Sequence, residues 1–108
     1  MAFTRICRID ELGAGEALRI DQGEEPIALF NVDGEFHAIQ DTCSHEEWSL
    51  AEGYLEGDVV VCALHMAKFC VRTGKVCAPP ATEAVKVFPV RVEGNEVFVD
   101  LAAGAILP

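Results

Sequence analysis

Short hydrophobic runs separated by turn-forming residues dominate this chain, and little of it repeats at the spacing of a helix. The clearest run is Ile27–Val32, which is followed by Asp33 and Gly34 and then by a second β-prone run at residues 35–39. Asp-Gly between two such runs is a strong signal for a two-residue hairpin turn. These residues therefore predict an antiparallel hairpin.

A second hairpin is predicted towards the C-terminal end. Residues 87–92 and 96–101 carry valines at alternating positions, and Glu-Gly-Asn at residues 93–95 separates them. Pro89 has no backbone N–H, so its strand is expected at a sheet edge or with a bulge. Together the two hairpins predict an all-β fold of antiparallel sheets.

Between the hairpins lies a third group of short strands. Residues 58–62 predict one strand and residues 68–71 another, and Thr73-Gly74 then reverses the chain towards residues 75–77. The loops between these strands are expected at their tips, above a rigid sheet. Such a scaffold is well suited to hold a metal site in place.

The rest of the chain offers few other elements. One helical turn is expected near residues 46–50, with a possible extension to Glu52, and residues 102–108 are expected to fray. No linker, repeat or low-complexity segment interrupts the 108 residues. We therefore expect a single domain over residues 1–108.

The chain is strongly acidic, with a net charge of −10. Residues 1–60 hold fourteen acidic and three basic side chains, whereas residues 61–108 hold four acidic and five basic ones. Such a surface repels phosphates, so we expect no nucleic acid as a partner. It suits a well-solvated protein, and equally a carrier steered by transient electrostatic docking to basic patches on its partners.

Nothing in the sequence predicts a membrane segment or an export signal. No run of about eighteen apolar residues is present, the longest being residues 59–64. The first ten residues lack the apolar core and cleavage pattern of a signal peptide. We therefore expect a cytoplasmic protein, whose cysteines outside any metal site, Cys7, Cys70 and Cys77, are buried small hydrophobic side chains.

Two short pairs of metal-ligand residues are the main candidates for chemistry. Cys43-Ser-His45 is followed, after sixteen residues, by Cys62-Ala-Leu-His65. Each pair supplies one thiolate and one imidazole, a set that can place one iron of a [2Fe-2S] cluster on sulfur and the other on nitrogen. Two neutral imidazoles in place of two thiolates remove negative charge, so the cluster accepts an electron more readily.

A structural zinc ion is the main alternative for these four residues, because zinc is also held by two cysteines with two histidines. Zinc loops usually pair like residues, however, with about two to four residues between the first two cysteines. A first pair of unlike residues separated by a single serine fits that pattern poorly. A zinc-binding interaction module therefore stays as an alternative.

Both loops resemble those of the Rieske ferredoxin family, over residues 43–50 and 62–69. The likeness continues over residues 69–81, where the proline pair at 79–80 matches the family's third loop beside the cluster. The chain is similar to the ferredoxin components of biphenyl, benzene and toluene dioxygenase systems. The resemblance implies a Rieske iron-sulfur domain whose cluster-binding subdomain covers approximately residues 41–81, with the cluster held by two loops at strand tips.

The resemblance also implies ligand roles and partners. Cys43 and Cys62 are expected to hold the buried iron of one [2Fe-2S] Rieske cluster, and His45 and His65 the outer iron. The chain is then an electron carrier and not itself an enzyme. A flavoprotein ferredoxin reductase that uses NADH is expected to supply single electrons, and the terminal Rieske oxygenase of an aromatic-ring dioxygenase to receive them. A small Rieske subunit fixed in another oxidoreductase complex is a further alternative.

Residues around the loops predict a low potential for a Rieske cluster. High-potential Rieske proteins of respiratory complexes carry a serine and a tyrosine after the second histidine, and a disulfide between the loops. This chain has Ala67 and Phe69 at the hydroxyl positions and Trp48 and Leu64 at the disulfide positions. Hydrogen bonds to the sulfur atoms stabilise the more negative, reduced cluster, so the loss of these donors is expected to lower the reduction potential. Glu46, a negative charge next to the first histidine, is expected to lower the potential further.

Two further features have less specific interpretations. Lys68, Arg72 and Lys75 form a basic group near the second loop, which is either a solvated strand face or a docking contact. His37 lies on a predicted hairpin flank without a second ligand nearby in sequence, so we expect a solvated histidine.

Overall fold

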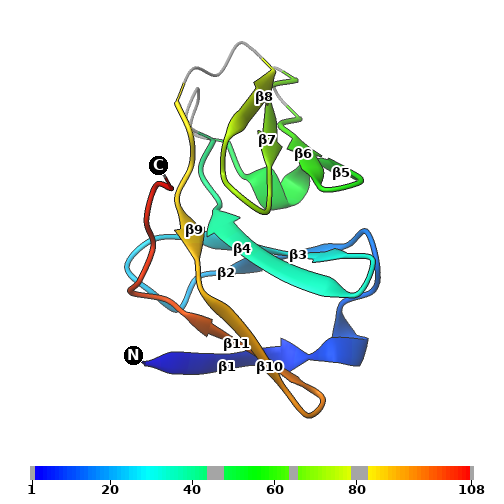
Figure 1. Ribbon diagram of the computed structural model, residues 1–108, viewed down its shortest axis with the longest axis vertical. Helices are drawn as coiled ribbons and strands as arrows, with labels where there is room; N and C mark the ends of the chain where they lie inside the picture. Colours follow the sequence, from blue (N-terminus) through cyan, green and yellow to red (C-terminus); the bar gives the residue numbers. More distant parts are fainter. Residues whose placement is uncertain (1, 44–47, 64–65, 79–82, 108) are drawn as a thin grey trace.

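Three antiparallel sheets, stacked along the long axis of the molecule, make up the computed structural model (Figure 1). The model describes residues 2–43, 48–63, 66–78 and 83–107. The lower sheet has the order β1 (Phe3–Arg8), β11 (Glu96–Asp100), β10 (Val90–Glu93). The central sheet has the order β2 (Ala17–Ile20), β3 (Ile27–Val32), β4 (Glu35–Gln40), β9 (Val87–Phe88). The upper sheet has the order β5 (Tyr54–Glu56), β6 (Val59–Val61), β7 (Lys68–Cys70), β8 (Val76–Ala78).

Strand β3 is buried on both faces because it lies between the other two sheets. Ala28, Phe30 and Val32 belong to a hydrophobic cluster shared with the upper sheet. Ile27 and Leu29 alternate with them and belong to a second cluster, shared with the lower sheet. This explains why the sequence of β3 is apolar at every position except Asn31 rather than alternating.

The first predicted hairpin is confirmed. Strands β3 and β4 pair from Val32 opposite Glu35 back to Ile27 opposite Gln40. Asp33 and Gly34 both have positive φ, 51° and 91°, as a type I′ turn requires.

The second predicted hairpin is present, but its turn is one residue shorter than predicted and its first strand is broken. Glu93 pairs with Glu96, so the turn is the two-residue Gly94-Asn95 rather than residues 93–95. Pro89 breaks the expected strand into β9 in the central sheet and β10 in the lower sheet. Because Pro89 has no N–H to donate, the chain changes sheets there.

The predicted group of short strands forms the upper sheet. Strand β6 pairs with β7, β7 pairs with β8, and the reversal between β7 and β8 contains Gly74 at φ 75°. A methyl group on Gly74 would collide with the carbonyl oxygen of Val85, so both its conformation and its surroundings require glycine.

Several elements were not predicted. Strands β1, β2 and β5 and the 3₁₀ turn η1 (Ile9–Glu11) had no clear local signal. The predicted helical turn is present only as the 3₁₀ turn η2 (Leu50–Glu52), while residues 46–47 lie outside the described residues.

The expectation that the C-terminal residues fray is wrong for residues 102–107. Ala105 exchanges two backbone hydrogen bonds with Val87, of 2.9 and 3.0 Å. Gly104 packs so closely against the Phe88 ring that a methyl group there would collide with it. The segment therefore covers β9 along one side of the molecule (Figure 1).

The cysteines outside the predicted metal site differ in exposure. Cys7 is buried as expected, and its burial raises the pKa of its thiol. Cys70 is partly buried, but Cys77 is exposed, so the expectation of burial is wrong there. Cys77 lies on β8, the edge strand of the upper sheet. It falls at a bulge, between Val76 and Ala78, which pair with Phe69 and Lys68 of β7.

Candidate metal centre

The first cysteine loop is closed at its base by backbone pairing. Thr42 and Ser49 form an isolated antiparallel bridge, and the N–H of Cys43 donates to the carbonyl of Trp48 at 2.9 Å. These contacts place Cys43 at the start of a short closed loop that leads into η2. His45 lies within this loop in sequence but outside the described residues.

The second cysteine loop begins where β6 ends. The N–H of Cys62 donates to the carbonyl of Ala67 at 2.8 Å, and the N–H of Met66 donates to the carbonyl of Cys62 at 2.9 Å. Met66 has φ 62°, an uncommon conformation for a residue with a side chain. His65 lies within this loop in sequence but outside the described residues.

The two loops are closed by the same kind of backbone hydrogen bond. In both, the cysteine N–H bonds to the carbonyl five residues later, although the predicted ligands are spaced Cys-x-His in one loop and Cys-x-x-His in the other. Cys43 and Cys62 are 4% and 0% exposed and belong to the same hydrophobic cluster. The fold therefore brings the two predicted thiolate ligands into one buried region.

This region suits an iron-sulfur cluster. Soft thiolates are the ligands that such clusters need, and apolar surroundings control solvent access and potential. Ala67 and Phe69 are fully buried in the same cluster as the two cysteines, and neither has a hydroxyl group to donate. The two positions that lack a hydroxyl group therefore lie in the buried core, beside the predicted thiolate ligands in the same hydrophobic cluster.

The residues next to the predicted ligands differ in exposure and backbone conformation. Ala67 is fully buried and has no positive φ, whereas its neighbour Met66 takes the left-handed conformation. Trp48, at one of the two disulfide positions of the high-potential class, is 37% exposed. Glu46 and Leu64 lie outside the described residues, as does the proline pair at 79–80.

The predicted basic group is largely neutralised by acidic neighbours. The Lys68 ammonium lies 3.5 Å from the Glu56 carboxylate. The Arg72 guanidinium donates to Glu35 and lies 3.2 Å from Asp58. These contacts favour the interpretation as a solvated strand face over an open docking patch.

Arg72 also connects the upper sheet to β4. Its contact with Glu35, followed by that of His37, holds the pKa of the Glu35 carboxyl below its usual value. His37 lies 3.3 Å from both Glu35 and Arg72, so this partly exposed histidine is part of the network.

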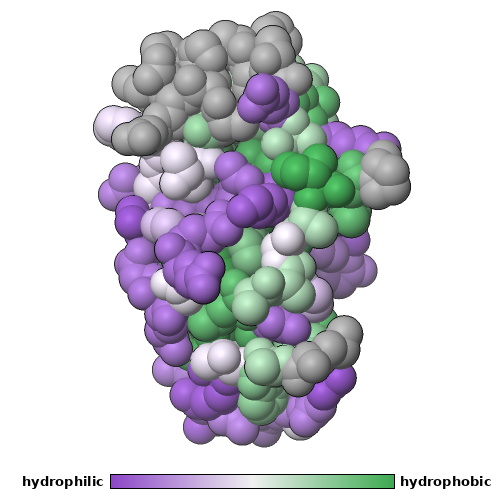
Figure 2. All heavy atoms as spheres, turned by 90° about the vertical axis from the view of Figure 1, so that its left-hand side faces the viewer, coloured by the Kyte–Doolittle hydropathy of each residue, from purple (hydrophilic) through white to green (hydrophobic). Residues whose placement is uncertain are grey.

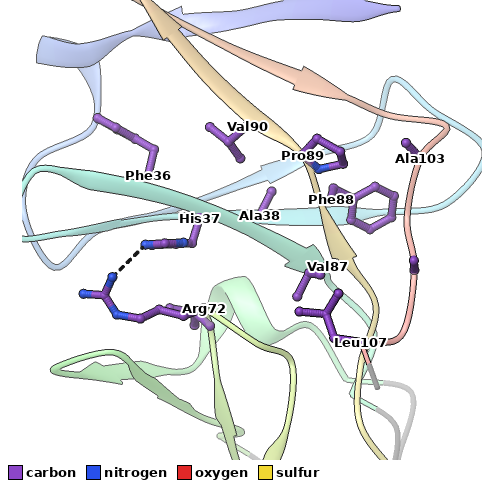
Figure 3. Close-up of a pocket in the computed structure, with 12 residues that line it drawn as sticks. Phe36, His37, Ala38, Arg72, Val87, Phe88, Pro89, Val90, Ala103 and Leu107 are labelled. Carbon is purple, nitrogen blue, oxygen red and sulfur yellow. Dashed lines mark hydrogen bonds between the residues drawn. The ribbon is translucent and has the colours of Figure 1, made fainter. Parts of the chain in front are cut away.

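A groove of about 460 Å³ lies beside this network, between β4, the β9–β10 segment and the C-terminal residues (Figure 3). His37 and Arg72 point towards each other at one end, and Val87 and Leu107 lie close together at another part of the wall. On this side of the molecule, hydrophobic side chains gather in patches between larger hydrophilic areas (Figure 2). Neither Cys43 nor Cys62 lines the groove, so it is separate from the candidate metal centre.

Asp41 is the residue near the site to which the sequence analysis assigned no role. It is 1% exposed and precedes Cys43 by two residues. An acidic residue directly after a predicted strand, two residues before a predicted ligand, is the signal that could have drawn attention to it.

Two kinds of feature are absent from the described residues, a metal-binding group of side chains and a membrane-spanning helix. Within the described ranges, no group of three or more histidine, cysteine or acidic side chains is arranged to hold a metal ion, and two of the four predicted ligands lie outside those ranges. Nor does the described part of the chain contain a helix long and apolar enough to span a membrane.

Comparison with protein families gives a match over most of the chain. Residues 2–89 match the family described as "Rieske [2Fe-2S] domain". The biphenyl dioxygenase ferredoxin subunit of Pseudomonas sp. (strain KKS102) is 57% identical over 107 residues, which cover 98% of this chain and 98% of that protein. The ferredoxin component of biphenyl 2,3-dioxygenase from Rhodococcus jostii (strain RHA1) is 58% identical over 104 residues, covering 96% and 97%.

A solved structure shows the same fold. A chain from the complex of reduced oxygenase and oxidized ferredoxin in carbazole 1,9a-dioxygenase matches with a TM-score of 0.87 and 37% identity. The match covers 90% of this chain and 91% of the other.

Proposed function

The chain belongs to the Rieske [2Fe-2S] domain family, and from that membership we propose that it is the ferredoxin component of an aromatic-ring dioxygenase system. It carries single electrons to a terminal oxygenase and forms no bond in the substrate. The observation that carries this proposal is the 57% identity to a biphenyl dioxygenase ferredoxin subunit over 98% of both chains. The two similarly closed cysteine loops in one buried region agree with it.

The proposed ligands of the single [2Fe-2S] cluster are Cys43, His45, Cys62 and His65. When bound, the cluster accepts and releases one electron. The buried thiolates of Cys43 and Cys62 would hold one iron, and the imidazoles of His45 and His65 would hold the other. Phe69 and Ala67 are fully buried in the same hydrophobic cluster as the two cysteines and exclude water from it, and the backbone closure of each loop holds its cysteine in place.

The proposed partners are a flavoprotein ferredoxin reductase and the terminal Rieske oxygenase. The solved complex of a similar ferredoxin with its oxygenase supports the second partner. A carrier must leave one partner to reach the other, and the net charge of −10 favours fast, transient encounters with basic surfaces. The proposed location is the cytoplasm, where NADH is available to the proposed flavoprotein reductase.

Reconstitution tests the function. The purified protein is expected to contain iron and sulfide and to give the electron paramagnetic resonance (EPR) spectrum of a Rieske cluster after reduction. With NADH and a flavoprotein reductase it should become reduced, and a biphenyl-type terminal oxygenase should then oxidise it. Stopped-flow absorbance measures both steps.

Cysteine variants provide the matched control. C62S is expected to abolish the cluster spectrum, whereas C77S, which changes an exposed cysteine, should retain it. Zinc without iron would contradict the proposal and favour a structural zinc module. A normal cluster in a protein that co-purifies in a permanent complex would favour a fixed oxidoreductase subunit instead.

A further inference from the structure

Asp41 is a buried carboxylate whose side chain contacts residues that follow the Cys43 loop and a residue on strand β2. Its side chain is 2% exposed. The oxygen Oδ1 accepts hydrogen bonds from the hydroxyl of Ser49 and from the backbone N–H of Ala51, both at 2.9 Å. The oxygen Oδ2 lies 3.6 Å from Nη1 of Arg19 on β2. A buried charge needs such partners to replace its lost hydration.

The backbone of Asp41 adds two more hydrogen bonds. Its N–H donates to the carbonyl of Pro26 at 3.0 Å, and its carbonyl accepts the N–H of Leu50 at 2.6 Å. Asp41 thus ties the residues before the loop of Cys43 to those that follow it. It also anchors the loop to the central sheet, since Pro26 immediately precedes β3.

The same carboxylate reaches the strand that carries the second cysteine. Ala51 lies in η2, and Gly53 follows that turn directly. Gly53 packs so closely against the carbonyl of Val61 that a methyl group there would collide with it. Val61 is the last residue of β6 and immediately precedes Cys62. Asp41 is therefore linked through η2 to the start of the second loop.

We propose that Asp41 is a positioning residue that holds the two cysteine loops in a fixed position relative to each other. It acts through Ser49, Ala51 and η2, so that Cys43 and Cys62 hold the separation that a [2Fe-2S] cluster requires. This inference rests on the proposed function, because it takes the two cysteines as ligands. Residues that orient metal ligands typically change metal affinity by about 10- to 100-fold when replaced.

The test compares holoproteins of the wild type, D41A, D41N and a control, D100A. Asp100 is a second buried aspartate, 4% exposed, which accepts the N–H of Ala102 at 3.2 Å. It lies at the end of β11 in the lower sheet, away from both cysteine loops (Figure 1). Three quantities are measured: the rate of cluster loss to a chelator, the g values of the reduced EPR spectrum and the urea midpoint of unfolding.

D41A is expected to lose its cluster about 10- to 100-fold faster than the wild type and to show shifted g values. D41N should recover most of the wild-type behaviour, because its amide oxygen can accept the same two hydrogen bonds. D100A should keep the wild-type g values even where its unfolding midpoint falls as far as that of D41A.

Unchanged g values in D41A, with cluster loss that merely follows the unfolding midpoint as in D100A, would overturn the inference. If D41A does not accumulate as folded protein, S49A, which removes a single hydrogen bond, is measured instead. Shifted g values in S49A support the inference and unchanged ones overturn it. A wild-type protein without the Rieske spectrum would overturn the proposed function as well, whereas a normal wild-type spectrum isolates failure of the inference alone.

Discussion

Phe69 is an apolar residue in the hydrophobic cluster that holds the two cysteines, at a position where high-potential Rieske proteins carry a tyrosine. It is fully buried in the hydrophobic cluster that contains Cys43 and Cys62, and it lies on β7 opposite Val60. A phenyl ring excludes water and donates no hydrogen bond to sulfur. Because hydrogen bonds to cluster and cysteine sulfur stabilise the reduced state, this position favours a low reduction potential.

Phe69→Tyr is therefore expected to raise the midpoint potential. The new hydroxyl enters a region closed to solvent, where an unpaired polar group costs about 1–3 kcal/mol, so a bond to a cysteine sulfur is favoured. Redox titration with dye mediators measures the change. Phe30→Tyr, which adds the same group elsewhere in that cluster, is the control. An unchanged midpoint together with reduced thermal stability would show that the hydroxyl does not reach sulfur.

At the scale of elements, Arg72 joins the upper sheet to the central one. It follows β7 and contacts Glu35 at the start of β4 and Asp58 in the turn just before β6. Side-chain contacts across such a junction complement the shared hydrophobic cluster, since ion pairs have directional requirements that apolar packing lacks. Glu35 is 60% exposed, so solvent screening keeps the stabilisation by this pair small.

Glu35→Gln is expected to weaken the acid dependence of stability. The folded-state pKa of Glu35 is lowered, first by Arg72 and then by His37. The carboxylate therefore contributes stability above its unfolded pKa of about 4.3, and this contribution is lost as the pH falls through the lower folded value.

Urea unfolding midpoints measured over a pH series test this expectation. Glu35→Gln should be less stable than the wild type at neutral pH, and the two should converge under acid conditions. Glu24→Gln, which changes an exposed residue in the loop between β2 and β3, is the control. A constant difference at all pH values would contradict a role for the charged carboxylate.

For the whole molecule, the important property is the acidic composition combined with a candidate metal centre whose two cysteines follow β4 of the central sheet and β6 of the upper sheet. Opposite charge on a partner raises the rate of encounter. Salt screens this attraction beyond a Debye length of about 8 Å at physiological ionic strength. Hydrophilic groups cover most of the face seen in Figure 2, which is consistent with a carrier that docks briefly.

Electron transfer to the oxygenase is expected to slow as salt concentration rises. Glu52→Gln, in η2 beside the cysteine loops, should lower the rate and reduce its salt dependence more than Glu93→Gln, which removes the same charge from the distant β10–β11 hairpin. Stopped-flow kinetics at several ionic strengths measure both effects. Rates that are independent of salt would exclude electrostatic steering.

Several features of the fold could be predicted because their causes are local. Asp33-Gly34 determines its own turn through the two positive φ angles that it accepts, and Pro89 marks the place where strand pairing stops. The pairing of β1 with β11 could not be predicted, because Phe3 and Asp100 meet only when the whole chain has folded. The same holds for Ala105, whose bonds to Val87 are invisible in an unremarkable C-terminal sequence.

The candidate site divides in the same way. The sequence by itself predicted the ligand chemistry, because the identity and spacing of Cys43, His45, Cys62 and His65 are local properties that restrict which metals fit. Only the tertiary structure decided that both cysteines share one buried cluster, and that the Asp41 carboxylate faces Ser49 and Ala51. Burial and compensation of a charge depend on segments that meet in space, and local spacing carries no record of those meetings.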